Sequence, residues 1–136
     1  MRASQDNYQP ENNPYKTQRG LKRVWFAAGH SLQGFVFAFR EESAFRQELL
    51  LTALMAPWAF ILDISTVERI LLIASLLLVL MFELINSGIE AAIDRISFDA
   101  HSLSKRAKDY GSAAVFLSLL LCGGTWVALL YPVVHF

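Results

Sequence analysis

Hydrophobic positions in this chain gather into three long runs. The run LLLTALMAPWAFILDISTV, residues 49–67, is interrupted only by Asp63. A second run begins near Arg69, continues through ILLIASLLLVLMF and passes directly into the polar stretch ELINSGIEAAID. The third, GSAAVFLSLLLCGGTWVALLYPVVHF, contains no Asp, Glu, Lys or Arg. Because about 20 apolar residues cross a bilayer as a helix, the pattern predicts three spans. They cover about residues 48–67, 69–94 and 111–133.

The segment before these runs predicts a helix of another kind. In RVWFAAGHSLQGFVFAFREESAFRQE, apolar and small residues recur at about helical spacing, and the charges gather at the ends. We expect an amphipathic helix at about residues 21–45 in the membrane interface; the alternative is a cytoplasmic helix packed on the bundle. Residues 1–18 are polar and predict a disordered extension, which leaves residues 19–136 as one membrane domain. The predicted fold class is all-α, a polytopic membrane protein.

The composition supports this class. Hydrophobic residues make up 54% and charged residues 18% of the chain, against roughly 25% charged residues in soluble domains. A soluble helical bundle is the alternative, but the third run lacks the polar face that such a helix shows. The formal net charge is zero, so no nucleic-acid partner is expected. Cys122 stands in an apolar run and is interpreted as a small buried hydrophobe.

The basic residues predict the orientation of the spans. Seven Lys and Arg residues precede the first run and four lie between the second and third, whereas the first connection has only Arg69 and the C-terminus has none. By the positive-inside rule, the N-terminus and the second connection face the cytoplasm, and the C-terminus lies on the opposite side. The polar stretch after the second run is therefore expected at the cytoplasmic face.

That polar stretch carries Glu83, Asn86, Glu90 and Asp94 at spacings of three, four and four. At about 100° per residue, these side chains fall within a strip about 80° wide on a helix. Ionised groups at membrane depth usually face a bundle interior or a water-filled cleft, and carboxylate and amide oxygens suit Mg²⁺. Two other interpretations stay open. The carboxylates could pair with arginines that lock helices together, or they could serve a proton relay or transport.

Further polar groups are expected on the same side of the membrane. Glu42 and Glu48 stand at the start of the first span. The predicted loop SFDAHSLSKRAKDYGSAA adds charged and polar side chains, namely Asp99, His101, Arg106, Lys108 and Asp109. Carboxylates for a metal ion and cations for phosphate suit phosphoryl transfer to a lipid-borne acceptor. The chain has no GxxxxGKS or GxxxxGKT motif, so ATP binding would need a construction unlike that of P-loop proteins.

Three ordered motifs resemble those of the small bacterial integral-membrane diacylglycerol kinases. They are ESAFRQE (42–48), ELINSGIEAAID (83–94) and RAKDYGSAAV (106–115), and the resemblance covers about Leu21 to Tyr131. It implies a homotrimer of three-span protomers whose sites are shared between protomers. It also implies transfer of the γ-phosphate of MgATP to the sn-3 hydroxyl of diacylglycerol, which gives phosphatidic acid, at the bacterial inner membrane.

Position by position, the resemblance implies roles for individual residues. Glu83 is the expected catalytic base, Asn86 supports it and Asp94 closes the same face. Glu42 and Glu90 are the expected ligands of Mg²⁺. Contacts to ATP and its metal are implied at Arg23, His30, Glu42, Glu90, Asp99, His101, Lys108 and Asp109. Contacts to diacylglycerol and membrane lipid are implied at Arg23, Ala28, Ser31, Ala44, Arg46, Glu48, Glu83 and Ser112.

Two other functions stay open at this point. The related undecaprenol kinases share fold and chemistry but phosphorylate a polyprenyl alcohol, although ESAFRQE and RAKDYGSAAV are more similar to the diacylglycerol branch. A non-enzymatic membrane protein, an ion-binding channel or a scaffold, would use the carboxylates to line a pore or to pair internally.

Overall fold

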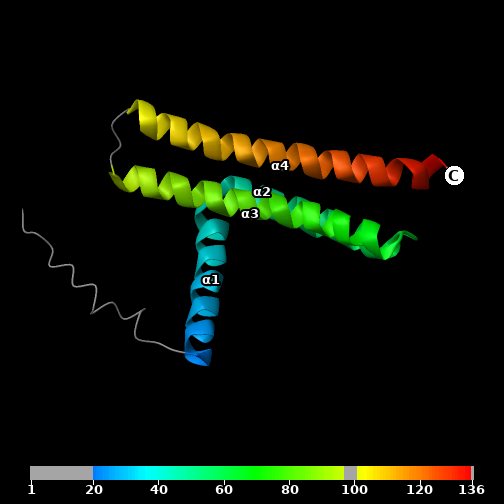
Figure 1. Ribbon diagram of the computed structural model, residues 1–136, viewed down its shortest axis with the longest axis horizontal. Helices are drawn as coiled ribbons and strands as arrows, with labels where there is room; N and C mark the ends of the chain where they lie inside the picture. Colours follow the sequence, from blue (N-terminus) through cyan, green and yellow to red (C-terminus); the bar gives the residue numbers. More distant parts are fainter. Residues whose placement is uncertain (1–19, 97–100, 136) are drawn as a thin grey trace, which may run out of the picture. The chain divides into compact units, whose positions relative to one another are not determined.

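A computed structural model of the chain describes residues 20–96 and 101–135 (Figure 1). All regular structure in these two ranges is helical, which confirms the predicted all-α class. The helices are α1 (Leu21–Glu41), α2 (Ser43–Ile61), α3 (Thr66–Ile96) and α4 (Ser102–His135). The predicted N-terminal extension, residues 1–18, and Asp99 lie outside the described residues.

The chain divides into two compact units, residues 1–34 and 35–136, so that α1 begins in the first and ends in the second. Within α1, large apolar side chains are exposed on the single chain: Val24, Trp25, Phe26, Leu32, Phe35, Val36, Phe37 and Phe39. The predicted helix over about 21–45 corresponds to α1, which ends at Glu41.

The break between α1 and α2 falls at Glu42, whose backbone is extended with φ −99° and ψ 114°. Arg46 explains why the first helix stops there. Its Nη1 donates hydrogen bonds to the carbonyl oxygens of Phe39, at 3.2 Å, and of Arg40, at 3.1 Å. The last carbonyls of a helix have no partner within the helix, and a cation near that end is favourable. Arg46 thus stabilises the end of α1 from the first turn of α2.

The turn between α2 and α3 is held by side chains at both of its ends. Arg69 donates from Nε to the carbonyl oxygen of Ala59 at 2.8 Å, near the end of α2. Ser65 and Glu68 form a reciprocal cap at the start of α3: Ser65 N donates to Glu68 Oε2 at 2.8 Å, and Glu68 N donates to Ser65 Oγ at 3.3 Å. Because of this turn, the predicted first span of residues 48–67 is not one continuous helix.

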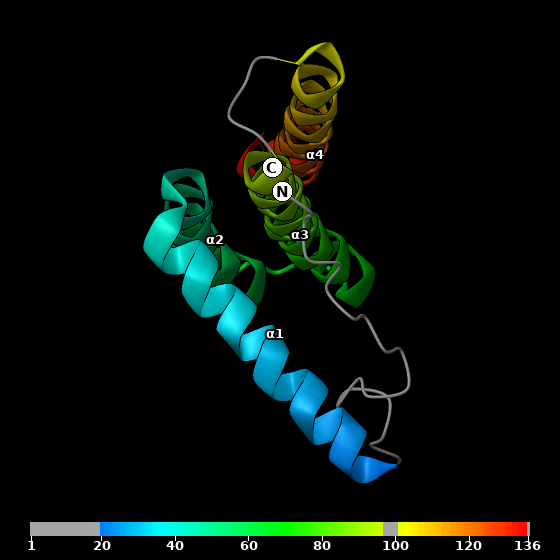
Figure 2. The ribbon, with the colours of Figure 1, turned by 90° about the vertical axis from the view of Figure 1, so that its left-hand side faces the viewer.

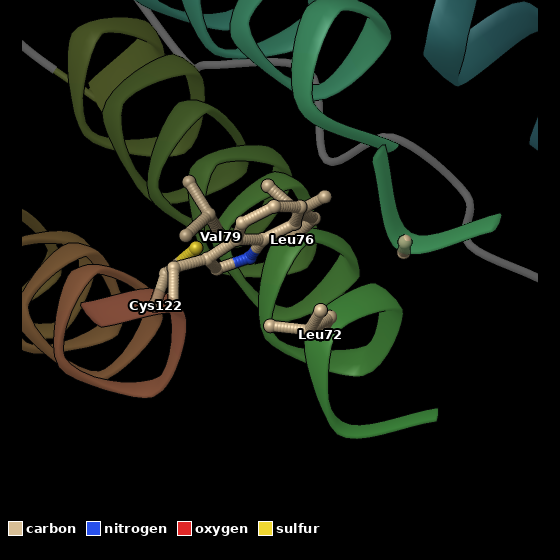
Figure 3. Close-up of a cluster of buried hydrophobic side chains, with 6 residues drawn as sticks. Leu72, Leu76, Val79 and Cys122 are labelled. Atoms are coloured by element: carbon tan, nitrogen blue, oxygen red, sulfur yellow. The ribbon is translucent and has the colours of Figure 1, made fainter. Parts of the chain in front are cut away.

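In the second unit, α3 packs against both α2 and α4 (Figure 2). Helices α3 and α4 run side by side in opposite directions (Figure 1). A core cluster joins the three helices through Ala59, Leu72, Leu76, Val79, Cys122 and Trp126. Figure 3 shows Cys122 of α4 directed at the α3 side chains of this cluster. The cysteine is 6% exposed, as the sequence predicted for a small buried hydrophobe.

Two helices among the described residues are long and apolar enough to cross a membrane: Thr66–Ile96 and Ser102–Tyr131. They correspond to the second and third predicted spans. Helix α2 is not one of them, since it has 19 residues and its first turns carry Arg46 and Glu48. Its apolar part is therefore shorter than the about 20 residues of a full span. Two of the three predicted spans are therefore found as helices long and apolar enough to cross a membrane.

The outer faces of α2, α3 and α4 are apolar and uncovered in the single chain. They include large side chains at Leu50, Leu54, Trp58, Ile70, Leu71, Leu77, Met81, Phe116, Leu117, Leu120 and Val127. Water is a poor environment for a continuous apolar surface of this kind. Two helices of spanning length with apolar outer faces are what a membrane protein requires.

Candidate active site

Helix α3 carries the predicted polar strip without interruption, because it runs from Thr66 to Ile96. The four side chains change steadily in exposure along it. Glu83 is 4% exposed and Asn86 is 9% exposed, whereas Glu90 and Asp94 are partly open to solvent. The strip therefore begins inside the packed helices and emerges at the C-terminal end of α3.

The start of α2 brings two further carboxylates to this strip. Phe45, which is 2% exposed, packs with Ala38 and with Leu80 of α3, and this contact seats the first turn of α2 against α3. Glu83 consequently lies within electrostatic reach of Glu42 and Glu90, and Glu48 lies within reach of Glu83. Like charges this close repel each other, so a bound cation or a proton on one of the carboxylates would stabilise the cluster.

No group of three or more His, Cys, Asp and Glu side chains in the part of the chain that the structure describes is placed to hold a metal ion. Mg²⁺ does not require such a cage. It is usually bound by one or two carboxylates together with substrate phosphates and water. The hard oxygen donors of Glu42 and Glu90, both near the buried Glu83, fit that requirement.

Asn86 connects the strip internally and to α4. Its Nδ2 donates a hydrogen bond to Oε1 of Glu90 at 3.0 Å. Its Oδ1 is buried and has no hydrogen-bond partner among the described residues, and the same holds for Oε2 of Glu48. Gly111 of α4 lies directly against this carboxamide: a Cβ placed on Gly111 would overlap Oδ1 of Asn86. Asn86 therefore touches α4 and positions Glu90 at the same time.

Lys108 faces the outer end of the strip from α4. Its Nζ lies 2.6 Å from Oδ1 of Asp94, and its charge is also within electrostatic reach of Glu90. The pair joins α3 to α4 at their polar ends, with the two side chains 35% and 45% exposed. A cation thus lies beside the carboxylates of Asp94 and Glu90.

The predicted loop after α3 is partly helical, which corrects the sequence interpretation. Helix α4 begins at Ser102. His101 caps it, since its Nδ1 accepts a hydrogen bond from the backbone N of Leu103 at 3.2 Å. Lys105 and Asp109 form an exposed pair, Nζ to Oδ2 2.6 Å. Pairs at i and i+4 stabilise a helix, and this spacing was a signal for helix in the sequence.

The other candidate residues are divided between the two compact units. Arg46 is bonded to the end of α1, as described above. Ala44 is exposed in the first turn of α2, and Ser112 is exposed on α4 beside the buried Gly111. On α1, Ser31 donates its hydroxyl to the carbonyl oxygen of Ala27 at 3.0 Å. Arg23, Ala28 and His30 also lie on α1, in the first compact unit.

Sequence reasoning missed two residues that shape the site. Gly111 was visible only as part of a motif, because nothing in a sequence shows which residue of another helix a glycine faces. Arg69 was counted only as a charge for orientation, yet it closes the turn between α2 and α3. A partly buried arginine beside the end of a helix has carbonyl oxygens as natural partners.

Comparison with known proteins matches most of the chain to one protein family. The family model described as prokaryotic diacylglycerol kinase matches residues 29–130. A diacylglycerol kinase of Pseudomonas aeruginosa is 53% identical over 118 residues, which cover 87% of this chain and 96% of that protein. The diacylglycerol kinase of Escherichia coli K12 is 45% identical over 120 residues, 86% of this chain and 94% of that one. One from Helicobacter pylori is 38% identical over 108 residues, 79% and 84%.

A helical membrane protein with a carboxylate strip at the polar end of one span is the class that the fold defines. The chain belongs to the prokaryotic diacylglycerol kinase family. This confirms the resemblance noted from the three motifs and makes the chain a member of a family of kinases, enzymes that transfer phosphate to an alcohol acceptor.

Proposed function

We propose that the protein transfers the γ-phosphate of MgATP to the sn-3 hydroxyl of diacylglycerol, giving phosphatidic acid and ADP. The observation that carries the proposal is the buried carboxylate of Glu83, 4% exposed on a helix of spanning length and surrounded by other carboxylates. A glycerol backbone stays at the membrane interface, so a base for its hydroxyl has to be placed on a spanning helix.

Glu83 is the proposed general base. In the transfer, the bond between the γ-phosphorus and the ADP oxygen breaks and a bond from the lipid oxygen to that phosphorus forms. Glu83 takes the proton of the lipid hydroxyl. A base within reach of the acceptor proton contributes about 10²–10⁴-fold to the rate. Asn86 supports the strip through its bond to Glu90, and the buried Oε2 of Glu48 is the proposed acceptor for a hydroxyl of the lipid.

Glu42 and Glu90 are the proposed holders of Mg²⁺, and Lys108 and Asp109 the proposed nucleotide contacts. Bound Mg²⁺ would neutralise charge on the β- and γ-phosphates as the phosphoryl group moves. The cation of Lys108 lies next to Asp94 and near Glu90, which supports a role at the phosphates. If a phosphate oxygen displaced Asp94 from Lys108, the ammonium group would still make one charge-assisted hydrogen bond.

The proposed assembly is a homotrimer in the bacterial inner membrane, with three spans in each protomer and α1 in the cytoplasmic interface. The uncovered apolar faces of α2, α3 and α4 support contact with lipid and with other copies. The short apolar part of α2 is proposed as the first span, because its exposed face carries Leu50, Leu54 and Trp58. The positive-inside rule puts the strip at the cytoplasmic face.

The test is phosphate transfer from γ-labelled ATP with Mg²⁺ in mixed micelles. Dioleoylglycerol and undecaprenol are offered in separate reactions, to wild-type protein and to the Glu83→Gln variant. We expect label in phosphatidic acid with wild type and none with Glu83→Gln. Label in polyprenyl phosphate alone would show that the substrate is a polyprenyl alcohol, as for the related undecaprenol kinases. Absence of label in both lipids would refute the kinase proposal.

A further inference from the structure

Gly111 differs from the other glycines of the described helices in what surrounds it. A Cβ built on Gly29, Gly34, Gly88, Gly123 or Gly124 meets nothing within 4 Å. A Cβ on Gly111 would overlap Oδ1 of Asn86 and would lie 3.2 Å from its Cγ. The backbone of Gly111 has no positive φ. Position 111 therefore requires glycine for lack of space, because Asn86 occupies the place that a side chain would take.

The conformation of Asn86 in this space has a consequence for Glu90. With its Oδ1 against Gly111, the carboxamide directs Nδ2 at Oε1 of Glu90, where the hydrogen bond is 3.0 Å long. The Oδ1 atom has no hydrogen-bond partner among the described residues, so no donor fixes that side of the amide. The space that Gly111 leaves therefore admits the orientation of the amide that bonds Glu90.

We propose that Gly111 is a positioning residue for the metal-binding carboxylate of Glu90. By offering no side chain, Gly111 lets α4 hold Asn86 in place, and Asn86 in turn orients Glu90. The inference rests on the proposed function, in which Glu90 is a ligand of the Mg²⁺ that accompanies ATP. Gly111 touches neither lipid nor nucleotide in this scheme, and it acts only through Asn86.

The structure predicts where the Gly111→Ala variant would yield. Alanine is a better helix former than glycine, so α4 itself keeps its conformation. The overlap is with the end of a side chain, and rotation of Asn86 relieves it without separating the two helices. That rotation breaks the bond to Glu90. Loss of one hydrogen bond to a charged group corresponds to about a tenfold change in an equilibrium constant. Here the dissociation constant of the metal ion should increase.

The experiment is a double-mutant cycle of Gly111→Ala and Asn86→Ala, with Gly124→Ala as the matched control on the same helix. Two quantities are measured on full-length protein in detergent micelles. The first is the Mg²⁺ concentration for half-maximal phosphate transfer at saturating ATP and lipid. The second is the dissociation constant of Mn²⁺, followed by electron paramagnetic resonance without ATP or lipid. Thermal unfolding of each variant reports on the fold.

We expect Gly111→Ala to raise both quantities about tenfold and Gly124→Ala to leave both unchanged. In the Asn86→Ala background, adding Gly111→Ala should change neither, because the contact is already gone. Unchanged metal dependence in Gly111→Ala would overturn the proposal, and so would an equal loss in both backgrounds. If wild type phosphorylated no lipid, the proposed function would fail by itself, and the Mn²⁺ series would still decide the role of Gly111.

Discussion

Lys108 and Asp94 link the polar ends of α4 and α3 through an ion pair of 2.6 Å. Both side chains are about one third to one half exposed, and exposed pairs contribute little to stability. The position of Lys108 near Glu90 gives it a different importance, because a phosphate bound there would compete for its ammonium group.

The Lys108→Met variant should therefore lose activity far more than stability. We expect kcat/KM for ATP to fall about a hundredfold, the usual cost of removing one charged donor to a transferring group, while the unfolding temperature changes little. Steady-state kinetics at varied ATP and thermal unfolding in micelles measure the two effects. The Arg95→Met variant, which removes an exposed cation one residue from Asp94, is the control. A parallel loss of activity in that control would contradict a specific role of Lys108.

The Glu83→Gln variant should fold and be nearly inactive. An amide is close in shape to the carboxylate but cannot take the proton of the lipid hydroxyl, so kcat should drop about a thousandfold. Since Glu83 is 4% exposed among carboxylates, replacing its charge should also raise the unfolding temperature. The exposed Glu41→Gln change is the matched control. Retention of more than about a tenth of the wild-type kcat would remove Glu83 from the role of base.

Arg46 is predicted to act on structure, through the end of α1. Replacing it with Met removes both hydrogen bonds to the carbonyl oxygens of Phe39 and Arg40. The free energy of unfolding should fall by about 1 kcal/mol, and amide hydrogen exchange should accelerate around the break at Glu42. The exposed neighbour Gln47, changed to Met, should show neither effect. A large increase in KM for diacylglycerol with unchanged exchange would instead favour direct substrate binding by Arg46.

Arg69 should matter for the turn between α2 and α3. The Arg69→Met variant leaves carbonyl oxygens of Ala59 and Leu62 without a donor from this side chain. For a partly buried site the cost should be about 2 kcal/mol of unfolding free energy. The metal dependence of transfer should stay as in wild type, since the turn is far along α3 from Glu90. Asp63→Asn, an exposed change in the same turn, is the control. Equal stability of the two variants would contradict the anchoring role.

The strip on α3 could be predicted from the sequence because it depends on helical periodicity alone, and Glu83, Asn86 and Glu90 lie within one helix. The membrane class followed from composition for a similar reason. By contrast, the end of α1 could not be placed, because no glycine or proline marks residue 42 and the capping group, Arg46, comes later in the chain.

Contacts between helices were out of reach for a different reason. The pairing of Lys108 with Asp94 and the fit of Asn86 against Gly111 depend on the register between α3 and α4. Periodicity fixes which face a residue occupies but not how far one helix is shifted along another. The helical turns before Gly111 are an exception, since the Lys105 and Asp109 pair is separated by four residues and could have been identified.

The uncovered apolar faces of the helices have a consequence for what the stability of this protein means. Many large apolar side chains that a soluble protein would bury in its own core are exposed on this chain. Their contacts are made with the medium around the protein. Thickness and composition of the host bilayer therefore enter the folding equilibrium as terms of their own. A thin membrane and a thick one would present the same sequence with two different stabilities.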